Sequence, residues 1–452
     1  MQDHKDIIEY VKNHPLGKVK VAVADIDGVL RGKYISAEKF LSAIDSGFGF
    51  CDVIFGWDCA DQAYDQVAFT GWHTGYPDAP ARIDLRTFRK IPWEQDVPFF
   101  LGELMDANGG PSPVCPRQLL RKVIAEAERM DFSLRISQEF EWFNFQETPD
   151  SLAEKKYSGL KPLSPGMFGY SLLRSSLRND YFTDLFELLR RMDIPLEGLH
   201  TETGPGVYEA AITYGLPMES ADRAILFKSA VREIANRHGI IATFMAKISE
   251  NLPGCSGHVH QSLWDAAGSR NLFFDAQQPN HMSEVMRHYI AGQLYCLPHV
   301  LPFMAPTVNS YKRLVEGAWA PTTLTWGIDN RTVALRALPG GEKSSRLETR
   351  VVGSDTHPYL AFAACIASGL YGVMNKLPLQ EMTSGNGYRD ERFGVLPRNL
   401  WESAEQMHQS SVARELFGDA FVEHFAASRL WEWKQSARVV TDWELKRYLE
   451  II

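Results

Sequence analysis

Residues 137–143 read Ser137-Gln138-Glu139-Phe140-Glu141-Trp142-Phe143, with two acids one residue apart inside an otherwise hydrophobic run. Alternate side chains of a β-strand share a face, so this run predicts a strand with Glu139 and Glu141 on one side and Phe140 and Trp142 on the other. Two carboxylates that close repel each other unless a proton or a cation lies between them. The pattern leaves three interpretations open: a shared-proton acid pair, an ion-pair network, or a divalent-metal site.

The composition is that of an ordinary soluble enzyme. The chain has 452 residues, enough for two or three domains with a large core, and is 45% hydrophobic and 23% charged. Its net charge of -9 excludes a general attraction for nucleic acid or for an anionic membrane. Its six cysteines form no CxxC pair, and residues 1–6 lack the basic start and apolar block of a signal peptide. We therefore expect reduced thiols and a cytoplasmic location.

A second acidic run, Asp25-Ile26-Asp27-Gly28-Val29-Leu30, follows a predicted strand at residues 19–24. It resembles the nucleophile motif of haloacid-dehalogenase phosphatases, in which an aspartate at the end of a strand attacks phosphate. The alternative is the turn of a β-hairpin, because Asp and Gly tolerate turn geometry and residues 33–35 supply the second strand.

The texture of the sequence changes at residues 108–113, which read Asn-Gly-Gly-Pro-Ser-Pro. Here we expect the boundary between an N-terminal domain of residues 1–110, whose short apolar runs are typical of a small sheet, and a larger domain of residues 111–452. The larger domain alternates strands and helices, which predicts an α+β fold. We expect one helix to begin at residue 116 and three others to span 181–192, 220–238 and 358–374. The expected strands span 196–202 and 206–212. The apolar segment 358–374 is shorter than the ~20 residues of a membrane span, so we expect a buried helix.

Three further clusters carry polar side chains at alternating positions. They comprise His258, His260 and Ser262; Arg346, Glu348 and Arg350; and Glu202 and Glu209 around a glycine turn. Taken alone, a histidine pair is often merely hydrogen-bonded, and two arginines flanking a glutamate form either a surface ladder or a site for phosphate and carboxylate groups.

Taken together, these motifs resemble the glutamine synthetase family from about residue 20 to the C-terminus. In family order they are Glu139-Phe-Glu141, the turn from Glu202 to Glu209, Ala242-Thr-Phe-Met-Ala-Lys247, the glycine-rich loop into His258-Val-His260, Asn309-Ser-Tyr-Lys-Arg313-Leu, Asn330-Arg331, and Arg346-Leu-Glu-Thr-Arg350 leading to Pro358-Tyr-Leu. The resemblance implies a small β-grasp domain and a large catalytic domain in which an antiparallel sheet forms a half-barrel with helices. It also explains Asp25 to Lys33 as the start of the β-grasp domain, which removes the phosphatase interpretation.

The resemblance implies two sets of metal ligands. Glu141, Glu202 and Glu209 would hold one divalent ion, and Glu139, His258 and Glu348 would hold the second. Five carboxylates and one imidazole suit Mg²⁺ or Mn²⁺ and are poor for zinc. We therefore expect ATP as co-substrate with two to three Mg²⁺ or Mn²⁺ ions that neutralise the acids and bridge the phosphates.

The resemblance also assigns the substrate-binding residues. Arg313 and Arg350 match positions that bind glutamate, with Gly254 lending backbone contacts. His260, Ser262, Arg336 and Arg346 match positions beside the nucleotide, and Arg331 matches one that acts during phosphoryl transfer. The implied reaction phosphorylates the γ-carboxylate of glutamate, because a carboxylate is not electrophilic, and an amine then attacks the acyl phosphate.

One loop departs from the ammonia-using members of the family. Their loop ends in a glutamate that closes the site and takes a proton from ammonium, whereas residues 315–321 here read Val-Glu-Gly-Ala-Trp-Ala-Pro, with Trp319 in that place. This resembles the branch that γ-glutamylates polyamines, ethanolamine or alkylamines, as does the ending at residues 440–448. We expect an organic-amine ligase. The alternatives are a glutamine synthetase that uses ammonia and a non-catalytic structural relative, against which the six intact metal ligands argue.

Other pocket positions lead to further expectations from the same resemblance. Asp58 is the possible counterpart of an aspartate that the N-terminal domain of one subunit lends to its neighbour, and Asp58 and Glu202 are the candidates for deprotonating the amine. Tyr170 matches a pocket tyrosine, while Gly257 and Val207 replace larger residues and suggest a wider entrance. Because family members build rings, we expect a dodecamer of two stacked hexamers.

Overall fold

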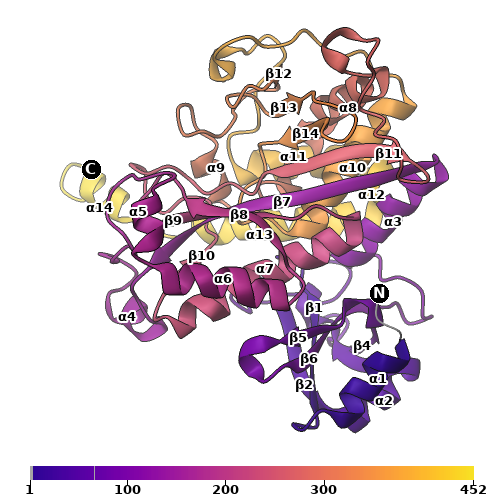
Figure 1. Cartoon of the computed structure of the whole chain (residues 1–452). Coiled ribbons are helices and arrows are strands. Elements are labelled where there is room, and N and C mark those ends of the chain that lie inside the picture. The colour runs from indigo at the N-terminus through magenta and orange to yellow at the C-terminus, as the bar shows by residue number, and fades with distance from the viewer. Residues whose placement is uncertain (1–3, 66) are drawn as a thin grey trace.

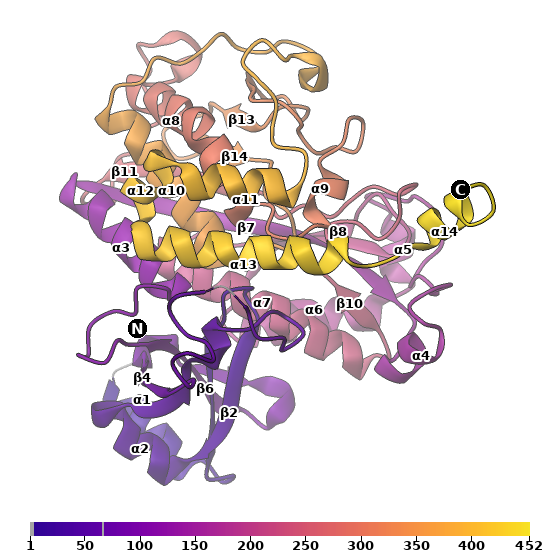
Figure 2. The same ribbon diagram turned by 180° about the vertical axis from the view of Figure 1, so that it is seen from behind.

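The structure is a computed structural model that describes residues 4–65 and 67–452. Residues 1–3 lie outside the described residues. They are part of the segment 1–6, in which we expect no signal peptide. The strands form two sheets, and the helices lie mostly against the larger one (Figure 1). The smaller sheet, with the first two helices, lies at one end of the molecule in both views (Figures 1 and 2). The fold is the α+β fold that we expected.

The first sheet has the strand order β2-β1-β6-β4-β3, with β5 paired to β6. Its strands are β1 (Lys18–Ala24), β2 (Leu30–Ser36), β3 (Phe48–Cys51), β4 (Asp78–Ile83), β5 (Arg89–Ile91) and β6 (Val97–Leu104). The strands β1 and β2 pair antiparallel with Ala24 opposite Leu30, so the hairpin predicted around Asp25 is confirmed. The strand β1 also pairs parallel with β6, so β1 lies inside the sheet and β2 lies at its edge.

The second sheet has the order β12-β13-β14-β11-β7-β9-β8, with β10 paired to β7. Its strands are β7 (Phe132–Phe145), β8 (Leu196–Thr201), β9 (Val207–Ile212), β10 (Ile241–Thr243), β11 (Val259–Asp265), β12 (Trp326–Ile328), β13 (Leu335–Leu338) and β14 (Arg346–Thr349). Only β12 and β13 are parallel among the pairs of this sheet that the described residues form. The long strand β7 crosses the whole sheet (Figure 1). Its Phe140 and Trp142 are fully buried while Glu139 and Glu141 face the other side, as predicted.

The helices of the described residues begin and end as follows. They are α1 (His4–Asn13), α2 (Ala37–Ser46), α3 (Pro116–Arg129), α4 (Pro149–Glu154), α5 (Leu172–Ser176), α6 (Asn179–Arg191), α7 (Pro217–Arg237), α8 (Glu284–Val300), α9 (Ser310–Arg313), α10 (Pro358–Met374), α11 (Leu400–Gln409), α12 (Ser411–Phe417), α13 (Asp419–Ala437) and α14 (Asp442–Tyr448). The four predicted helices are confirmed as α3, α6, α7 and α10, whereas the other helices, including the long α8 and α13, were not predicted.

The helix α10 forms the centre of the core. It packs against α3, α7 and α8, and its side chains from Pro358 to Leu370 are buried. None of the described helices combines the length and the apolar character that crossing a membrane requires. The six cysteines form no disulfide, as predicted. The domain boundary at residue 110 stays a prediction.

The hairpin turn between β1 and β2 joins the N-terminal sheet to two helices, α10 and α13. The Asp25 carboxylate accepts hydrogen bonds from the backbone N–H groups of Asp27 and Val29, at 2.9 and 2.8 Å, which fixes the turn. The Asp27 carboxylate then pairs with the buried guanidinium of Arg429 in α13. The Asp25 carbonyl lies 3.1 Å from His357 Nε2, directly before α10. The acids of this turn therefore hold the N-terminal sheet against the helices.

We expect Asp27→Ala to destabilise the protein. The change leaves the buried Arg429 guanidinium without its carboxylate, a loss of about 3 kcal/mol, which lowers Tm by roughly 3 °C for a chain of this length. Scanning fluorimetry measures the shift. The control is Asp61→Ala, because Asp61 pairs with Arg31 at 2.7 Å but is half exposed, so its Tm should stay within about 1 °C of the wild type. Equal shifts for both variants would contradict the assigned role of the Asp27–Arg429 pair.

Candidate active site

The first acidic cluster forms where three neighbouring strands align. Register places Glu141 of β7 opposite Glu209 of β9, and Glu209 opposite His200 of β8. His200 Nε2 lies 3.6 Å from Glu209 Oε2, and His200 Nδ1 lies 3.7 Å from Glu202 Oε2. Ligand atoms of His200, Glu202 and Glu209 all lie within 4.8 Å of one another, which fits a metal site. His200 was not among the predicted residues, although it alternates with Glu202.

Protein cations compensate the charge on this cluster only in part. Burial raises the pKa of Glu209 to about 10, and the carboxylates of Glu139, Glu141 and Glu202 add to the rise. Burial also raises the pKa of Glu141 to about 7, although the Ser256 N–H and Arg313 oppose it. Carboxyl groups held in this way retain protons unless a cation replaces them. The residues therefore fit a divalent cation.

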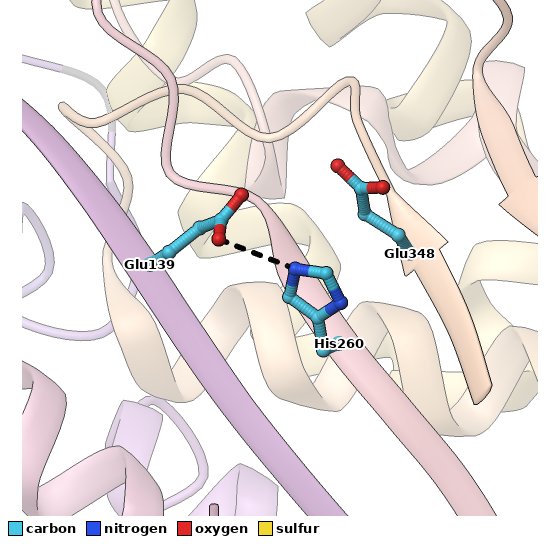
Figure 3. A group of neighbouring side chains, drawn as sticks. All are labelled: Glu139, His260 and Glu348. Carbon is cyan, nitrogen blue, oxygen red and sulfur yellow. Dashed lines mark ion pairs between the residues drawn. The ribbon is translucent and has the colours of Figure 1, made fainter. Parts of the chain in front are cut away.

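The second cluster joins β7, β11 and β14. His258 Nδ1 lies 2.9 Å from Glu139 Oε1 and 3.3 Å from Glu348 Oε1, while His260 Nε2 lies 3.4 Å from Glu139 Oε2. Figure 3 shows Glu139 directed toward His260, with Glu348 nearby on the adjacent strand. Ligand atoms of Glu139, His260 and Glu348 lie within 4.8 Å of one another. Both histidines thus reach the acids, although we predicted only His258 as a ligand.

His258 has a free ligand atom in this cluster. Its Nε2 is buried without a hydrogen-bond partner, and burial lowers the pKa of the ring to about 4, so the ring is neutral and able to bind a cation. Burial alone would raise the pKa of Glu348, but His258, Arg350 and His260 lower it to about 2. The second cluster therefore has strongly ionised oxygens beside a neutral imidazole, which suits Mg²⁺ or Mn²⁺.

The predicted arginines gather around Glu348. Arg336 Nη1 donates to Glu348 Oε2 at 2.8 Å, and Arg350 Nη1 donates to Glu348 Oε1. Arg350 Nε also donates to the main-chain carbonyl of Arg331 at 3.1 Å, while the Arg331 side chain is exposed. Arg346 Nε lies 3.4 Å from His260 Nδ1. These four arginines come from one segment of twenty residues, and Arg336 and Arg350 are the two that contact Glu348.

Arg313 lies deeper, behind the first cluster. It is 1% exposed and donates to the carbonyl of Val351 at 2.9 Å and to Ser256 Oγ at 2.9 Å. The Ser256 N–H in turn donates to Glu141 Oε2 at 2.8 Å, which links Arg313 to the acids. A Cβ at Gly254 would lie 2.7 Å from Arg313 Cγ, so only glycine allows this approach.

A cavity of about 450 Å³ opens beside the second cluster. Three of the four residues predicted to face the nucleotide, His260, Ser262 and Arg346, line it; Arg336 does not. Arg135 and Trp264 also line the cavity, and neither was predicted from the sequence. The volume is in the range of small-molecule sites.

The residues expected near the acceptor amine lie in different places. Trp319 is 56% exposed on its loop, and the neighbouring acid, Glu316, bonds to Arg389 at 3.0 Å. Tyr170 stacks on His200 with ring centroids 4.3 Å apart, beside the first cluster. Asp58 instead accepts hydrogen bonds from Trp431 Nε1 in α13 and from the main chain of its own loop.

The structure does not support the wider entrance expected from Gly257 and Val207. A Cβ at Gly257 would lie 2.6 Å from the carbonyl oxygen of Gly353, so the absent side chain leaves no space there. Val207 is 2% exposed and packs with Phe143 and Cys255. Both positions are filled by close packing, which the sequence did not indicate.

Comparisons with known proteins agree with this geometry. The family model described as glutamine synthetase, catalytic domain, matches residues 113–448. The chain belongs to the glutamine synthetase family. Type-1 glutamine synthetase 2 of Dictyostelium discoideum is 55% identical over 450 residues, which are 99% of this chain and 86% of that protein. Glutamate–isopropylamine ligase of a Pseudomonas species is 39% identical over 98% of this chain and 97% of that protein.

Solved structures show the same likeness. A GmaS/ADP complex superposes with a TM-score of 0.85 at 27% identity, covering 99% of this chain and all of the other. The protein is thus a glutamine synthetase-type, ATP-dependent carbon–nitrogen ligase that acts on glutamate. Members of the glutamine synthetase family use ATP and divalent metal ions, in keeping with the two clusters.

We expect the affinity of this glutamine synthetase-family protein for Mn²⁺ to rise with pH. The raised pKa values of Glu141 and Glu209 mean that the metal-free folded state binds more protons than the unfolded chain, so its stability falls as pH rises from about 4.5 toward 10. A bound cation displaces those protons, so affinity should increase up to about tenfold per pH unit for each proton released. Calorimetric titrations from about pH 6 to about pH 8 measure this. A flat profile would contradict the assigned protonation.

Proposed function

We propose that the protein joins the γ-carboxylate of glutamate to an organic amine through a γ-glutamyl phosphate. The observation that carries the proposal is the loop at residues 315–321. It presents an exposed indole at Trp319. Its acid, Glu316, accepts a hydrogen bond from the exposed Arg389 side chain. An indole packs on an alkyl chain and attracts a cationic amine through its π face by ~0.5–2 kcal/mol. Ammonium offers no alkyl chain for such a contact.

In the proposed reaction, a γ-carboxylate oxygen of glutamate attacks the γ-phosphorus of ATP and ADP leaves. The amine nitrogen then attacks the acyl carbon, phosphate leaves, and the nitrogen gives up a proton to Glu202 or to Asp58 of a neighbouring subunit. Bound divalent ions would supply charge neutralisation for the phosphates. The proposed ligands are Glu141, Glu202 and Glu209 for one ion and Glu139, His258 and Glu348 for the other, with His200 and His260 as additional candidates.

The arginines stabilise the negative charge of the reacting groups. Arg313 and Arg350, with the Gly254 main chain, are proposed to bind the glutamate carboxylates. Arg331, whose side chain is exposed, is proposed to contact the transferring phosphoryl group. The proposed nucleotide residues are His260, Ser262, Arg336 and Arg346.

Three of the relatives support an organic amine as acceptor. Besides the isopropylamine ligase, they include γ-glutamylethanolamide synthetase GlnA4 of Streptomyces coelicolor, 35% identical over 433 residues, and γ-glutamylputrescine synthetase PuuA of Escherichia coli, 28% identical over 459. Alkylamines, ethanolamine and polyamines are therefore the acceptor classes to test. Five other relatives are named glutamine synthetases, among them the Dictyostelium protein that is 55% identical, and they favour a second candidate function with ammonia as the acceptor.

An amine panel tests the proposal. With glutamate, ATP and Mg²⁺ fixed, phosphate release is measured for ammonium, isopropylamine, ethanolamine and putrescine at equal pH. We expect kcat/KM for a primary organic amine to exceed that for ammonium by more than about 10-fold, since a matched alkyl group contributes roughly 1–3 kcal/mol in a pocket. A preference for ammonium would favour glutamine synthesis instead.

We further propose the assembly and the setting of the enzyme. A dodecamer of two stacked hexamers would let Asp58 of one subunit approach the site of the next. Light scattering of the active protein measures the mass, and an active monomer would contradict the proposal. We also propose a cytoplasmic location and a division into two domains, residues 1–110 and 111–452.

A further inference from the structure

The Trp319 loop holds a conformation that its own sequence does not favour. Trp319 has a φ of 58°, in the left-handed region where a bulky side chain is strained. Such a conformation persists only when the surroundings impose it, and it often marks a functional position. Because more than half of the Trp319 side chain is exposed, burial of the indole does not impose it.

A neighbouring turn, η6 (Gly387–Arg389), is rigidly fixed. The Gly387 N–H donates to Thr332 Oγ1 at 2.8 Å, and Thr323 Oγ1 donates to the Gly387 carbonyl at 2.7 Å. A Cβ at Gly387 would lie 2.7 Å from the Thr332 carbonyl oxygen, so the turn packs directly on the main chain. Beyond the turn, residues 394–396 bond to residues 322–324, immediately after the Trp319 loop. The segment therefore forms a firm support beside the loop.

Two side chains of this turn face the loop. Arg389 Nε donates to Glu316 Oε1 at 3.0 Å. The Tyr388 hydroxyl is buried without a hydrogen-bond partner. Burial raises the pKa of Tyr388, whereas the Arg350 guanidinium and the main chain of Trp319 oppose the rise. The Arg389–Glu316 ion pair thus joins the turn to the start of the loop.

We infer that the η6 turn, through Tyr388 and Arg389, is a positioning element that holds the Trp319 indole at the acceptor site and thereby sets which amine is accepted. The role in amine choice rests on the proposed function; the bracing of the loop does not. Tyr388 and Arg389 act through Trp319 and touch no reacting atom. Their effect should therefore appear in KM for the amine and leave the binding of glutamate and ATP unchanged.

Reversing the charge of Arg389 tests whether the η6 turn holds the loop. Arg389→Glu places a second carboxylate against Glu316, and we expect the amides of residues 315–321 to exchange hydrogen roughly 3-fold faster or more, with KM for the preferred amine up by roughly 3- to 10-fold. KM for glutamate and for ATP should stay within about 2-fold. The double variant Glu316→Arg/Arg389→Glu restores the pair and should return both readouts to within about 2-fold of the wild type.

The matched control is Arg190→Glu. Arg190 forms an exposed ion pair with Glu187 at 2.7 Å in α6, outside the Trp319 loop and the η6 turn, so exchange in the loop and KM for the amine should stay as in the wild type. Tyr388→Phe separates positioning from chemistry: kcat within about 3-fold supports positioning, whereas a fall beyond about 10-fold would show a direct role of the hydroxyl and overturn the inference.

Two further results would also overturn the inference. One is unchanged exchange of residues 315–321 in Arg389→Glu, and the other is failure of the double variant to restore it. Exchange is measured without substrates, so it remains informative if the amine panel shows that ammonium is preferred. In that case the proposed acceptor is wrong, but hydrogen exchange in Arg389→Glu and in the double variant still shows whether the η6 turn holds the loop.

Discussion

Glu141→Gln should abolish ligase activity and at the same time stabilise the metal-free protein. Glu141 shares its face with Glu139 and lies opposite Glu209, and its raised pKa of about 7 shows that its charge is unfavourable without a cation. Neutralising it relieves repulsion, so Tm of the chelator-treated protein at about pH 8 should rise by roughly 1–2 °C. With Mg²⁺ present, the loss of one ligand should lower kcat by more than ~10²-fold.

Scanning fluorimetry with chelator and phosphate release with Mg²⁺ measure the two effects of Glu141→Gln. The amide oxygen of glutamine can still accept the hydrogen bond from the Ser256 N–H, so the local packing is retained. Full activity in excess chelator would refute the metal assignment. A lower Tm together with lost activity would instead show that Glu141 has a structural role.

Glu348→Gln should abolish activity as well, but with the opposite effect on stability. Glu348 is 1% exposed and accepts bonds from Arg336 and Arg350, with His258 beside it. Removing its charge leaves the Arg350 guanidinium without a carboxylate and leaves Arg336 paired with Asp329, a loss of about 3–5 kcal/mol, which lowers Tm by roughly 3–5 °C in a chain of 452 residues. Activity should fall by more than ~10²-fold.

Glu348→Gln is measured in the same two assays, and the contrast with Glu141→Gln is the informative result. Both carboxylates lie in the predicted metal sites, yet the pKa of Glu141 is raised despite Arg313, whereas the histidines and arginines around Glu348 lower its pKa. Tm changes of the same sign for the two variants would contradict the electrostatic difference between the clusters.

The sequence predicted those parts of the fold that local pattern determines. The alternation in residues 137–143 predicted β7, the Asp25 turn predicted the hairpin, and the apolar segment 358–374 predicted α10. The helix α1 was missed because it is short and only two of its side chains, Ile7 and Val11, are buried. So few buried positions give too weak a helical period to recognise.

The site residues that were missed depend on contacts between distant segments. His200 joins the first cluster only because β8 pairs with β9 in a register that sets it opposite Glu209. Arg135 and Trp264 line the cavity because β7 and β11 pair antiparallel, with Ser262 opposite Arg135. The close packing at Gly257 depends on Gly353, almost a hundred residues away. Such approaches are set by the tertiary structure and leave no local pattern.

A competition assay tests the proposed acceptor most directly. The enzyme is given glutamate, ATP and Mg²⁺ with equal concentrations of ammonium and the most active organic amine of the panel, and mass spectrometry measures the ratio of the two products. The account predicts that the γ-glutamyl amide exceeds glutamine by more than about 10-fold, the ratio expected from a matched alkyl contact. Glutamine as the major product would contradict it.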